Sequence, residues 1–249
     1  MNLTPINLHI HGSDLIFKVR ENSTGDHGVV QQIFQNLDYD VSHWVQGQKL
    51  LAYHQEQSKI RQSLIIDAGA NIGASVVYFK NTYPQAYVYA IEPEINNWQL
   101  LEINTSKYGD KTNFYGAISN VDGTLNLIDP GLSDWGFRTE TSRAGDMRQT
   151  RVPCISPQSI LNNAQFAHMT PLIFKIDIEG AEEQLFDGDT SWMDKFALIV
   201  IELHDWMLPF SGSSSHFFKA MVQHDFDFVH KGENVFLFNR RILAPNLAV

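Results

Sequence analysis

The chain has 249 residues, of which 43% are apolar and 18% are charged, a composition that supports a buried core and argues against disorder. Its formal net charge of -10 would repel a phosphate backbone, so we expect no nucleic-acid partner. Cys154 is the single cysteine, which excludes an internal disulfide and a cysteine-rich zinc site. No stretch approaches the ~18 apolar residues of a membrane span, and we expect a cytoplasmic protein.

Short apolar runs alternate with helix-like segments along most of the chain. The runs lie at residues 64–66, 87–91, 112–118, 172–176 and 197–201, and helical spacing recurs at 74–81, 94–108, 179–186 and 216–223. Near-continuous apolar runs are typical of strands that are covered on both faces. This alternation predicts an α/β fold with a doubly wound, mostly parallel sheet.

The N-terminal part has a different pattern. Residues 15–20 alternate like a strand, and residues 29–37 have the spacing of a short helix. We expect these residues to pack outside the main sheet, as an N-terminal cap segment over residues 1–60. Residues 61–249 then form the main domain of a single-domain protein.

Two later segments also depart from the alternation of strands and helices. Residues 226–230 and 234–239 flank Lys231-Gly232-Glu233, which predicts a C-terminal hairpin with an antiparallel strand at the sheet edge. Residues 129–150 contain many small polar side chains and predict a long loop. A lid and a structural hairpin anchored by aromatic side chains are equally compatible with this loop.

The first motif is a glycine-bearing turn between a strand and a helix. Its residues are Asp67, Gly69, Ala70, Asn71, Ile72, Gly73 and Ser75. The two glycines lack Cβ atoms, so a ligand and the following helix can approach the backbone. Near Asn71 and Ser75 the new helix exposes unpaired N–H groups, which can bind a ligand carboxylate.

The side chain of Asp67 indicates the charge of the ligand. A carboxylate at the lip of the turn would repel a pyrophosphate and attract an ammonium group. The dinucleotide fingerprint G-x-G-x-x-G fails, because Asn71 and Ala74 occupy its second and third glycine positions, and no G-K-[ST] triad of a P-loop follows. A turn without any ligand is the alternative interpretation.

The second motif, Ile91-Glu92-Pro93, ends the next predicted strand. In an open α/β sheet, ligands bind outside the carboxyl ends of the strands. Glu92 can accept hydrogen bonds from both hydroxyls of a ribose, each contributing about 1.5–3 kcal/mol. Alone, Glu92 would more often be an N-terminal charge of the helix that follows, but its spacing from Asp67 favours the ribose role.

Two further strand ends carry polar side chains. Asp177 and Glu179 follow one of them, and Glu202 and His204 follow the other. Asp177 could equally be an N-cap, with the acidic residues complementing a helix dipole. Packing alone hardly explains polar side chains at so many strand ends along one edge, so the sequence predicts a functional site there.

These motifs together resemble the FkbM-type methyltransferases, a branch of the class I S-adenosylmethionine-dependent enzymes. The resemblance covers roughly residues 15–240 and rests on four segments: Asp67-Ala-Gly-Ala-Asn-Ile-Gly73, Ile91-Glu-Pro93, Gly116-Ala-Ile-Ser119 with Gly123, and Lys175-Ile-Asp-Ile-Glu-Gly-Ala-Glu182. The last segment is close to diagnostic of the branch. The resemblance implies a Rossmann-like, seven-stranded sheet and S-adenosylmethionine as cofactor.

The resemblance also implies roles for individual residues. Residues 67–73 would hold the methionine end of the cofactor, Glu92 and Pro93 its ribose, and Ala117 and Ile118 would lie near the adenine. Asp177 would lie beside both the cofactor and the acceptor, and Glu179, Glu202 and His204 would border the acceptor. An aspartate sometimes found beside the adenine is not evident after Tyr115, so we expect backbone groups to recognise that base.

The acceptor implied by the resemblance is a hydroxyl of a small molecule or a carbohydrate. Methyl transfer mainly requires orientation, worth ~7–11 kcal/mol, and a base for the hydroxyl proton. His204 is the first choice by intrinsic pKa, with Asp177 and Glu179 as alternatives. We assign no metal ligand, and the sequence leaves open whether a divalent metal assists. Two rival functions are a non-catalytic metabolite-binding module and a metal-dependent hydrolase with Asp177, Glu179, Glu202 and His204 as ligands.

Overall fold

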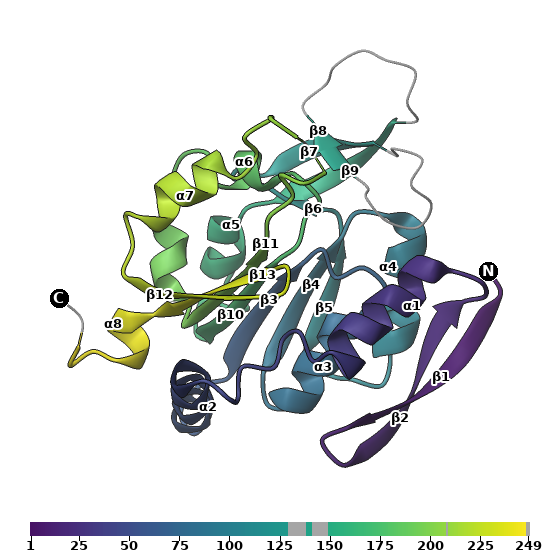
Figure 1. Cartoon of the computed structure of the whole chain (residues 1–249), viewed down its shortest axis with the longest axis horizontal. Helices are drawn as coiled ribbons and strands as arrows, with labels where there is room; N and C mark the ends of the chain where they lie inside the picture. The colour runs from purple at the N-terminus through teal and green to yellow at the C-terminus, as the bar shows by residue number, and fades with distance from the viewer. Residues whose placement is uncertain (129–137, 141–148, 208, 248–249) are drawn as a thin grey trace.

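A central sheet dominates the computed structural model, which describes residues 1–128, 138–140, 149–207 and 209–247 (Figure 1). Its strands are β3 (Ser63–Ala68), β4 (Tyr87–Glu92), β5 (Lys111–Tyr115), β10 (Thr170–Ile176), β11 (Leu198–Glu202), β12 (Phe226–Lys231) and β13 (Asn234–Asn239). The seven strands lie in the order β12-β13-β11-β10-β3-β4-β5. Strands β11 to β5 in this order are parallel, and β13 is antiparallel to both of its neighbours. The predicted α/β sheet with an antiparallel C-terminal hairpin is therefore confirmed.

The strand order reverses between β3 and β10. From β3 the chain proceeds outward through β4 to β5, then returns to β10 and continues in the opposite direction through β11. Ligands of doubly wound sheets bind at such a switch point, outside the carboxyl ends of the strands. The glycine turn follows β3 and Asp177 follows β10, so both predicted motifs lie at this position.

Helices cover both faces of the sheet, because alternate strand residues point to opposite sides. Ile65 and Val88 lie in a core with α3 (Ala74–Thr82), α4 (Ile95–Thr105) and α2 (Val45–Gln57). Leu64 and Tyr89 lie in the opposite core with α5 (Pro157–Asn162), α6 (Glu182–Leu185), η2 (Ser191–Lys195) and α7 (Ser215–Met221). A short helix, α8 (Arg240–Leu243), follows β13. None of the described helices is long and apolar enough to cross a lipid bilayer.

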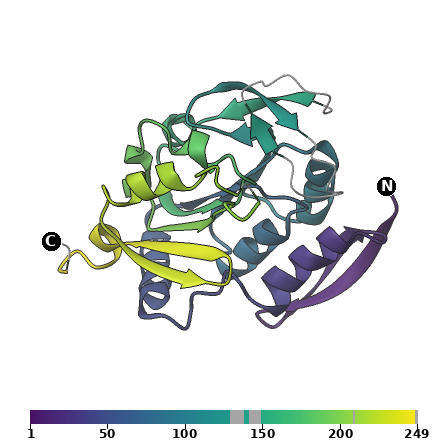
Figure 2. The same ribbon diagram turned by 45° about the horizontal axis from the view of Figure 1, so that its top comes forward.

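The N-terminal segment packs against the helices of the first face (Figure 2). It consists of the hairpin β1 (Leu3–Ile10) and β2 (Ser13–Arg20), helix α1 (Thr24–Val30) and the π-helical η1 (Gln31–Gln35). Phe17 and Val19 of β2 are fully buried in the core of that face. The expected strand at 15–20 is thus one half of a hairpin, and the expected helix begins earlier because Ser23 caps it. The sequence patterns did not indicate β1 or α2.

One side chain joins the N-terminal hairpin to the glycine turn. The amide of Asn104 in α4 accepts from Lys18 N at 2.8 Å and donates to Lys18 O at 2.9 Å. The same amide donates to Ile72 O in the turn at 2.9 Å. Asn104 is buried; its bond to Ile72 lies in the interior, whereas its two bonds to Lys18 are partly buried.

A second, small sheet stands above the carboxyl edge of the main sheet (Figure 1). It contains β6 (Ala117–Ile118), β7 (Gly123–Ile128), β8 (Arg138–Glu140) and β9 (Gln149–Ile155) in the order β6-β9-β7-β8. The single strand expected at 112–118 is therefore wrong, because the chain leaves the main sheet at Gly116. A Cβ atom there would lie 2.5 Å from Pro153 O. Within the expected loop at 129–150, β8 pairs with β7, while residues 129–137 and 141–148, where a lid would lie, are outside the described residues.

Candidate functional site at the switch point

The space left by the absent side chains of the two glycines in the turn is filled by other parts of the protein. Gly69 has a φ of +78°, and a Cβ atom there would lie 1.7 Å from the carbonyl oxygen of Asp177. Gly73 has a φ of +90°, and its Cβ would lie 2.9 Å from Leu101 Cδ1 in α4. The expectation that helix packing requires a glycine holds at Gly73. At Gly69 the space of the missing side chain is filled by the end of β10, and a ligand cannot occupy it.

Asp67 lies beneath the turn and is fully buried. Its Oδ2 accepts a hydrogen bond from Ser75 Oγ at 2.6 Å, and its Oδ1 lies 3.2 Å from Lys175 Nζ. Lys175 also donates to Gly69 O at 2.6 Å. Burial alone would lower the pKa of Lys175, but the charge of Asp67 holds it well above its usual value. The ammonium group that Asp67 attracts is therefore that of Lys175.

Glu92 is held at the end of β4 by two backbone amides. Its Oε2 accepts from Asn71 N at 2.8 Å, and its Oε1 accepts from Glu94 N at 2.9 Å. Burial raises the pKa of this carboxyl to about 7, although both amide bonds lower it. The Glu92 carboxylate is thus fixed beside the glycine turn, one strand away from Asp67, as the sequence predicts.

The remaining residues of the predicted cofactor site lie around Glu92. Gly116 N donates to Glu92 O at 3.1 Å, which brings Ala117 and Ile118 of β6 close to the end of β4. The side chains of Ala70, Ile72, Ser75, Ala117 and Ile118 are buried, whereas Asn71 and Pro93 are half-buried.

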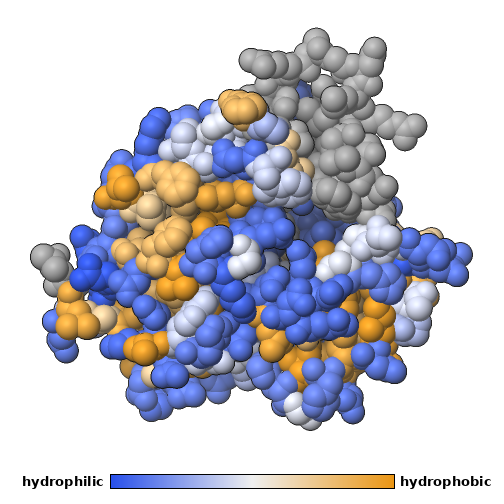
Figure 3. Space-filling model, viewed as in Figure 1, coloured by the Kyte–Doolittle hydropathy of each residue, from blue (hydrophilic) through white to orange (hydrophobic). Residues whose placement is uncertain are grey.

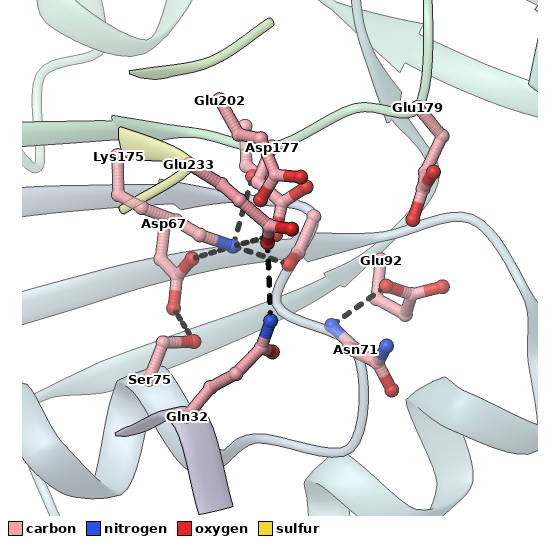
Figure 4. Close-up of polar contacts among 12 residues, drawn as sticks. Gln32, Asp67, Asn71, Ser75, Glu92, Lys175, Asp177, Glu179, Glu202 and Glu233 are labelled. Carbon is pink, nitrogen blue, oxygen red and sulfur yellow. Dashed lines mark hydrogen bonds and ion pairs between the residues drawn. The ribbon is translucent and has the colours of Figure 1, made fainter. Parts of the chain in front are cut away.

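A hollow lies between the glycine turn and the N-terminal segment. It is lined by Val29, Gln32, Ile33, Asp38, Tyr39, Gly69, Ala70, Asn71, Ser75, Lys175, Asp177, Glu202 and Asn234. Figure 4 shows Gln32 reaching across it to Glu233 of the β12–β13 turn, with Gln32 Nε2 donating to Glu233 Oε2 at 3.2 Å. The N-terminal segment therefore forms one wall of the site.

Three carboxylates surround His204 and form what we call the acidic cluster: Asp177, Glu179 and Glu202. His204 Nε2 lies 3.6 Å from Asp177 Oδ1, 3.7 Å from Glu179 Oε2 and 3.5 Å from Glu202 Oε1. On the opposite side of the ring, His204 Nδ1 donates to Glu182 Oε1 at 2.7 Å. All four predicted acceptor-site residues therefore meet at one point of the sheet edge.

The acidic cluster changes the pKa of its members. Burial and the charge of Asp177 raise the pKa of Glu179 to about 7 and that of Glu202 to about 8. Burial alone would lower the pKa of His204, but the bond to Glu182 and the charge of Asp177 raise it to about 9. His204 therefore carries a proton at neutral pH, which is unfavourable for the base role that its intrinsic pKa indicated.

Sequence reasoning gave no role to Lys175, Glu182, Gln32 or Tyr39. Lys175 had a detectable signal, because it is a lone charge inside the apolar strand β10 and a buried lysine needs a charged partner. Glu182 stands in the most specific motif, but its contact with His204 depends on the bend after Glu179. Glu179 has a φ of +55° and Gly180 a φ of +94°, so the helix expected at 179–186 begins only at Glu182.

The sheet order, the glycine turn and the acidic end of β4 define the class of S-adenosylmethionine-dependent methyltransferases with a Rossmann-like fold. The model of the methyltransferase FkbM domain matches residues 67–230. The chain belongs to this FkbM methyltransferase family, and S-adenosylmethionine is its cofactor. No curated protein matches the chain.

Solved structures similar to this chain include three methyltransferases. Methyltransferase FkbM from Methylobacillus flagellatus KT has 16% identity and a TM-score of 0.44, over 85% of this chain and 60% of that one. A putative caffeoyl-CoA O-methyltransferase from Staphylococcus aureus has 11% identity and a TM-score of 0.43, over 87% and 91%. Precorrin-6y C5,15-methyltransferase from Geobacter metallireducens GS-15 has 11% identity and a TM-score of 0.38, over 79% and 90%.

Proposed function

We propose that this chain transfers a methyl group from S-adenosylmethionine to a hydroxyl of a carbohydrate or another small molecule. The products are a methyl ether, S-adenosylhomocysteine and a proton. The observation that carries the proposal is that the acidic cluster and a groove with an exposed tryptophan adjoin the cofactor edge at the switch point. Family membership favours this transfer over the hydrolase alternative.

The cofactor supplies a methyl group on a positively charged sulfur. Glu92 is suited to the ribose, because each carboxylate oxygen keeps a lone pair beyond the one used by a backbone amide. Asn71 and the backbone at Gly69 and Ala70 line the hollow beside it, where the methionine end would lie. Asp67 acts indirectly, by holding Lys175 and Ser75 under the turn, and is a positioning residue.

The acceptor would bind in a groove directly after β11. Leu203, Trp206, His230, Glu233 and Val235 line this groove, and Trp206 is 59% exposed. Apolar side chains gather on the same face over α7 (Figure 3). An exposed aromatic ring can cover the apolar face of a sugar while a carboxylate such as Glu233 accepts its hydroxyls.

In the proposed reaction, the acceptor oxygen forms a bond to the methyl carbon while the carbon–sulfur bond breaks. The hydroxyl proton passes to a carboxylate of the acidic cluster. Glu202 is the member placed for this step, since it lines the hollow and adjoins Leu203 of the groove. It accepts the proton only in its ionised form, which its raised pKa of about 8 makes the main form above that pH. His204 is 1% exposed and its Nδ1 is bonded to Glu182, so we propose it as a positioning residue in place of the base.

The test is product formation with a panel of sugars and hydroxylated metabolites. The purified protein and S-adenosylmethionine should yield a product with one added methyl group by mass spectrometry. Trp206→Ala should raise the KM for the acceptor about tenfold, in line with ~1–3 kcal/mol for a lost aromatic contact, and leave the affinity for S-adenosylhomocysteine unchanged. Phe228→Ala, an exposed aromatic residue outside the groove, is the matched control. Cofactor binding without product across the panel would support a non-catalytic binding module instead.

A further inference from the structure

We propose that the acidic cluster is a binding site for one divalent metal ion, with Asp177, Glu179 and His204 as ligands. One oxygen of each carboxylate and one ring nitrogen of His204 lie within 4.8 Å of one another. A first-row ion has bonds of about 2.0–2.2 Å to such donors, so two of its ligand atoms lie at most about 4.4 Å apart, and these side chains would close slightly around it. The ligands follow the ends of β10 and β11, which are neighbouring parallel strands of the main sheet.

His204 provides evidence that is independent of the clustering of acids. The residue is almost fully buried, and Glu182 fixes its ring through the bond to Nδ1. A metal ion would displace the proton that Nε2 carries at neutral pH; the ring then keeps its Nδ1 proton, donated to Glu182, and directs the Nε2 lone pair at the acidic cluster. Among the described residues, Nε2 has no hydrogen-bond partner, only the three carboxylates at 3.5–3.7 Å. A carboxylate behind a histidine is the arrangement that orients metal-binding imidazoles.

The charges around the site also favour a cation. Asp177 directs Oδ2 toward Lys175 Nζ at 3.3 Å and Oδ1 toward His204. Lys175 is already engaged by Asp67 and the Gly69 carbonyl. No lysine or arginine in the described part of the chain forms an ion pair with Glu179 or Glu202. A divalent ion would supply the missing positive charge.

The donor set indicates which ion would bind. Two carboxylates and one imidazole suit Mn²⁺ and other first-row divalent ions, whereas Ca²⁺ and Mg²⁺ prefer oxygen ligands alone. The Asp177 and Glu179 side chains are 28% and 26% exposed, so one side of the site faces solvent. Metal sites that take part in reactions keep such an open position for water or substrate.

The consequence for the reaction rests on the proposed function. An acceptor hydroxyl bound at the open position would lose its proton more readily, since a metal ion stabilises the resulting oxyanion. The proton would still pass to Glu202, which lies beside the ligands without being one of them. The metal ion would therefore orient and activate the acceptor, while the methyl group comes from the cofactor.

Metal binding can be measured without any methyl acceptor. Protein dialysed against EDTA and then against chelator-free buffer is titrated with MnCl₂, and free Mn²⁺ is followed by its electron paramagnetic resonance signal. We expect one Mn²⁺ per chain, at least tenfold weaker binding in Glu179→Gln, and about 10–100-fold weaker binding in Glu182→Gln, which removes the partner of His204. Glu183→Gln should bind like the wild type, because Glu183 is the adjacent acid of α6 and points to His216 instead.

Binding of S-adenosylhomocysteine by the same samples separates the two proposals and reports on folding. No Mn²⁺ uptake at millimolar concentration, with S-adenosylhomocysteine still bound, would overturn the metal site and leave the proposed function standing. Equal Mn²⁺ affinity in Glu179→Gln and Glu183→Gln would place the ion elsewhere and also overturn the proposal. Normal Mn²⁺ binding without methylated product would uphold the metal site and count against the proposed function.

Discussion

Buried carboxylates have different partners on the cofactor side and on the acceptor side of the switch point. On the cofactor side, Asp67 is paired with Lys175 and Ser75, and Glu92 accepts two backbone amides. On the acceptor side, the carboxylates of the acidic cluster face each other around His204. The charges on the cofactor side are balanced by groups of the protein, whereas those on the acceptor side need a bound cation or acceptor to balance them.

This difference has a physical consequence for ligand binding. Groups that are already fixed by hydrogen bonds lose little freedom when a ligand arrives, so their contacts contribute more of their energy to affinity. Groups that repel each other gain stability only when a ligand enters. Mutations on the cofactor side should therefore reduce fold stability and cofactor affinity, and those on the acceptor side should mainly affect the acceptor and the metal ion.

The largest effect is expected from Lys175→Met. It leaves the fully buried Asp67 without its charged partner, and breaking a buried pair in this way costs about 3–5 kcal/mol. The free energy of unfolding in urea should fall by this amount. Lys59→Met, which removes an exposed pair with Glu56, should change stability by less than about 1 kcal/mol. Similar losses in both variants would show that the pair beneath the turn is not a structural support.

A smaller effect is expected from Glu92→Gln, which also places an amide NH2 group opposite one of the two backbone N–H donors. The substitution keeps the size of the side chain but removes the charge and half of the acceptor capacity for the ribose hydroxyls. Two charge-assisted bonds weakened in this way amount to about 3 kcal/mol, or ~100-fold in the calorimetric Kd for S-adenosylhomocysteine. Glu102→Gln is the matched control. Glu102 lies on α4, away from the cofactor, and its carboxylate is 4.0 Å from Lys111 Nζ. An unchanged Kd for Glu92→Gln would remove Glu92 from the site.

The smallest effect is a pH dependence of cofactor binding. Since the pKa of Glu92 is raised to about 7 and the ionised form is the better acceptor, binding requires loss of its proton below that pH. The Kd for S-adenosylhomocysteine should be constant above about pH 8 and rise up to tenfold between pH 7 and pH 6. Glu92→Gln should abolish this dependence. A wild-type Kd that is constant from pH 6 to pH 8 would contradict the role of the ionised carboxylate.

Much of the fold follows from local sequence patterns. The strands β3, β4, β10 and β11 are almost entirely buried, so burial on both faces is recorded directly in their apolar runs. The hairpin β1–β2 was only half detected, because Leu3–Ile10 is mostly exposed and lacks such a run. The break between β5 and β6 depends on the approach of Pro153, which is distant in sequence and leaves no local signal.

The site was predictable where it depends on strand ends and less so where it depends on contacts between side chains. Glu92 and the acidic cluster follow strands whose carboxyl ends share one edge, so their meeting could be inferred. The pairing of Asp67 with Lys175 could have been anticipated from a charge inside an apolar strand. The contribution of Gln32 and Tyr39 could not, since the N-terminal segment reaches the hollow only through tertiary packing.

The shared amide of Asn104 links the two ends of this arrangement. Deleting the N-terminal hairpin would remove two of the three hydrogen bonds of this amide, each worth about 0.5–1.5 kcal/mol. The same amide donates to the carbonyl oxygen of Ile72. The deletion would therefore make the glycine turn, where the methionine end of the cofactor is expected to bind, less rigid. Variants that begin after Arg20 should therefore bind the cofactor more weakly, even though the deleted strands do not line the hollow.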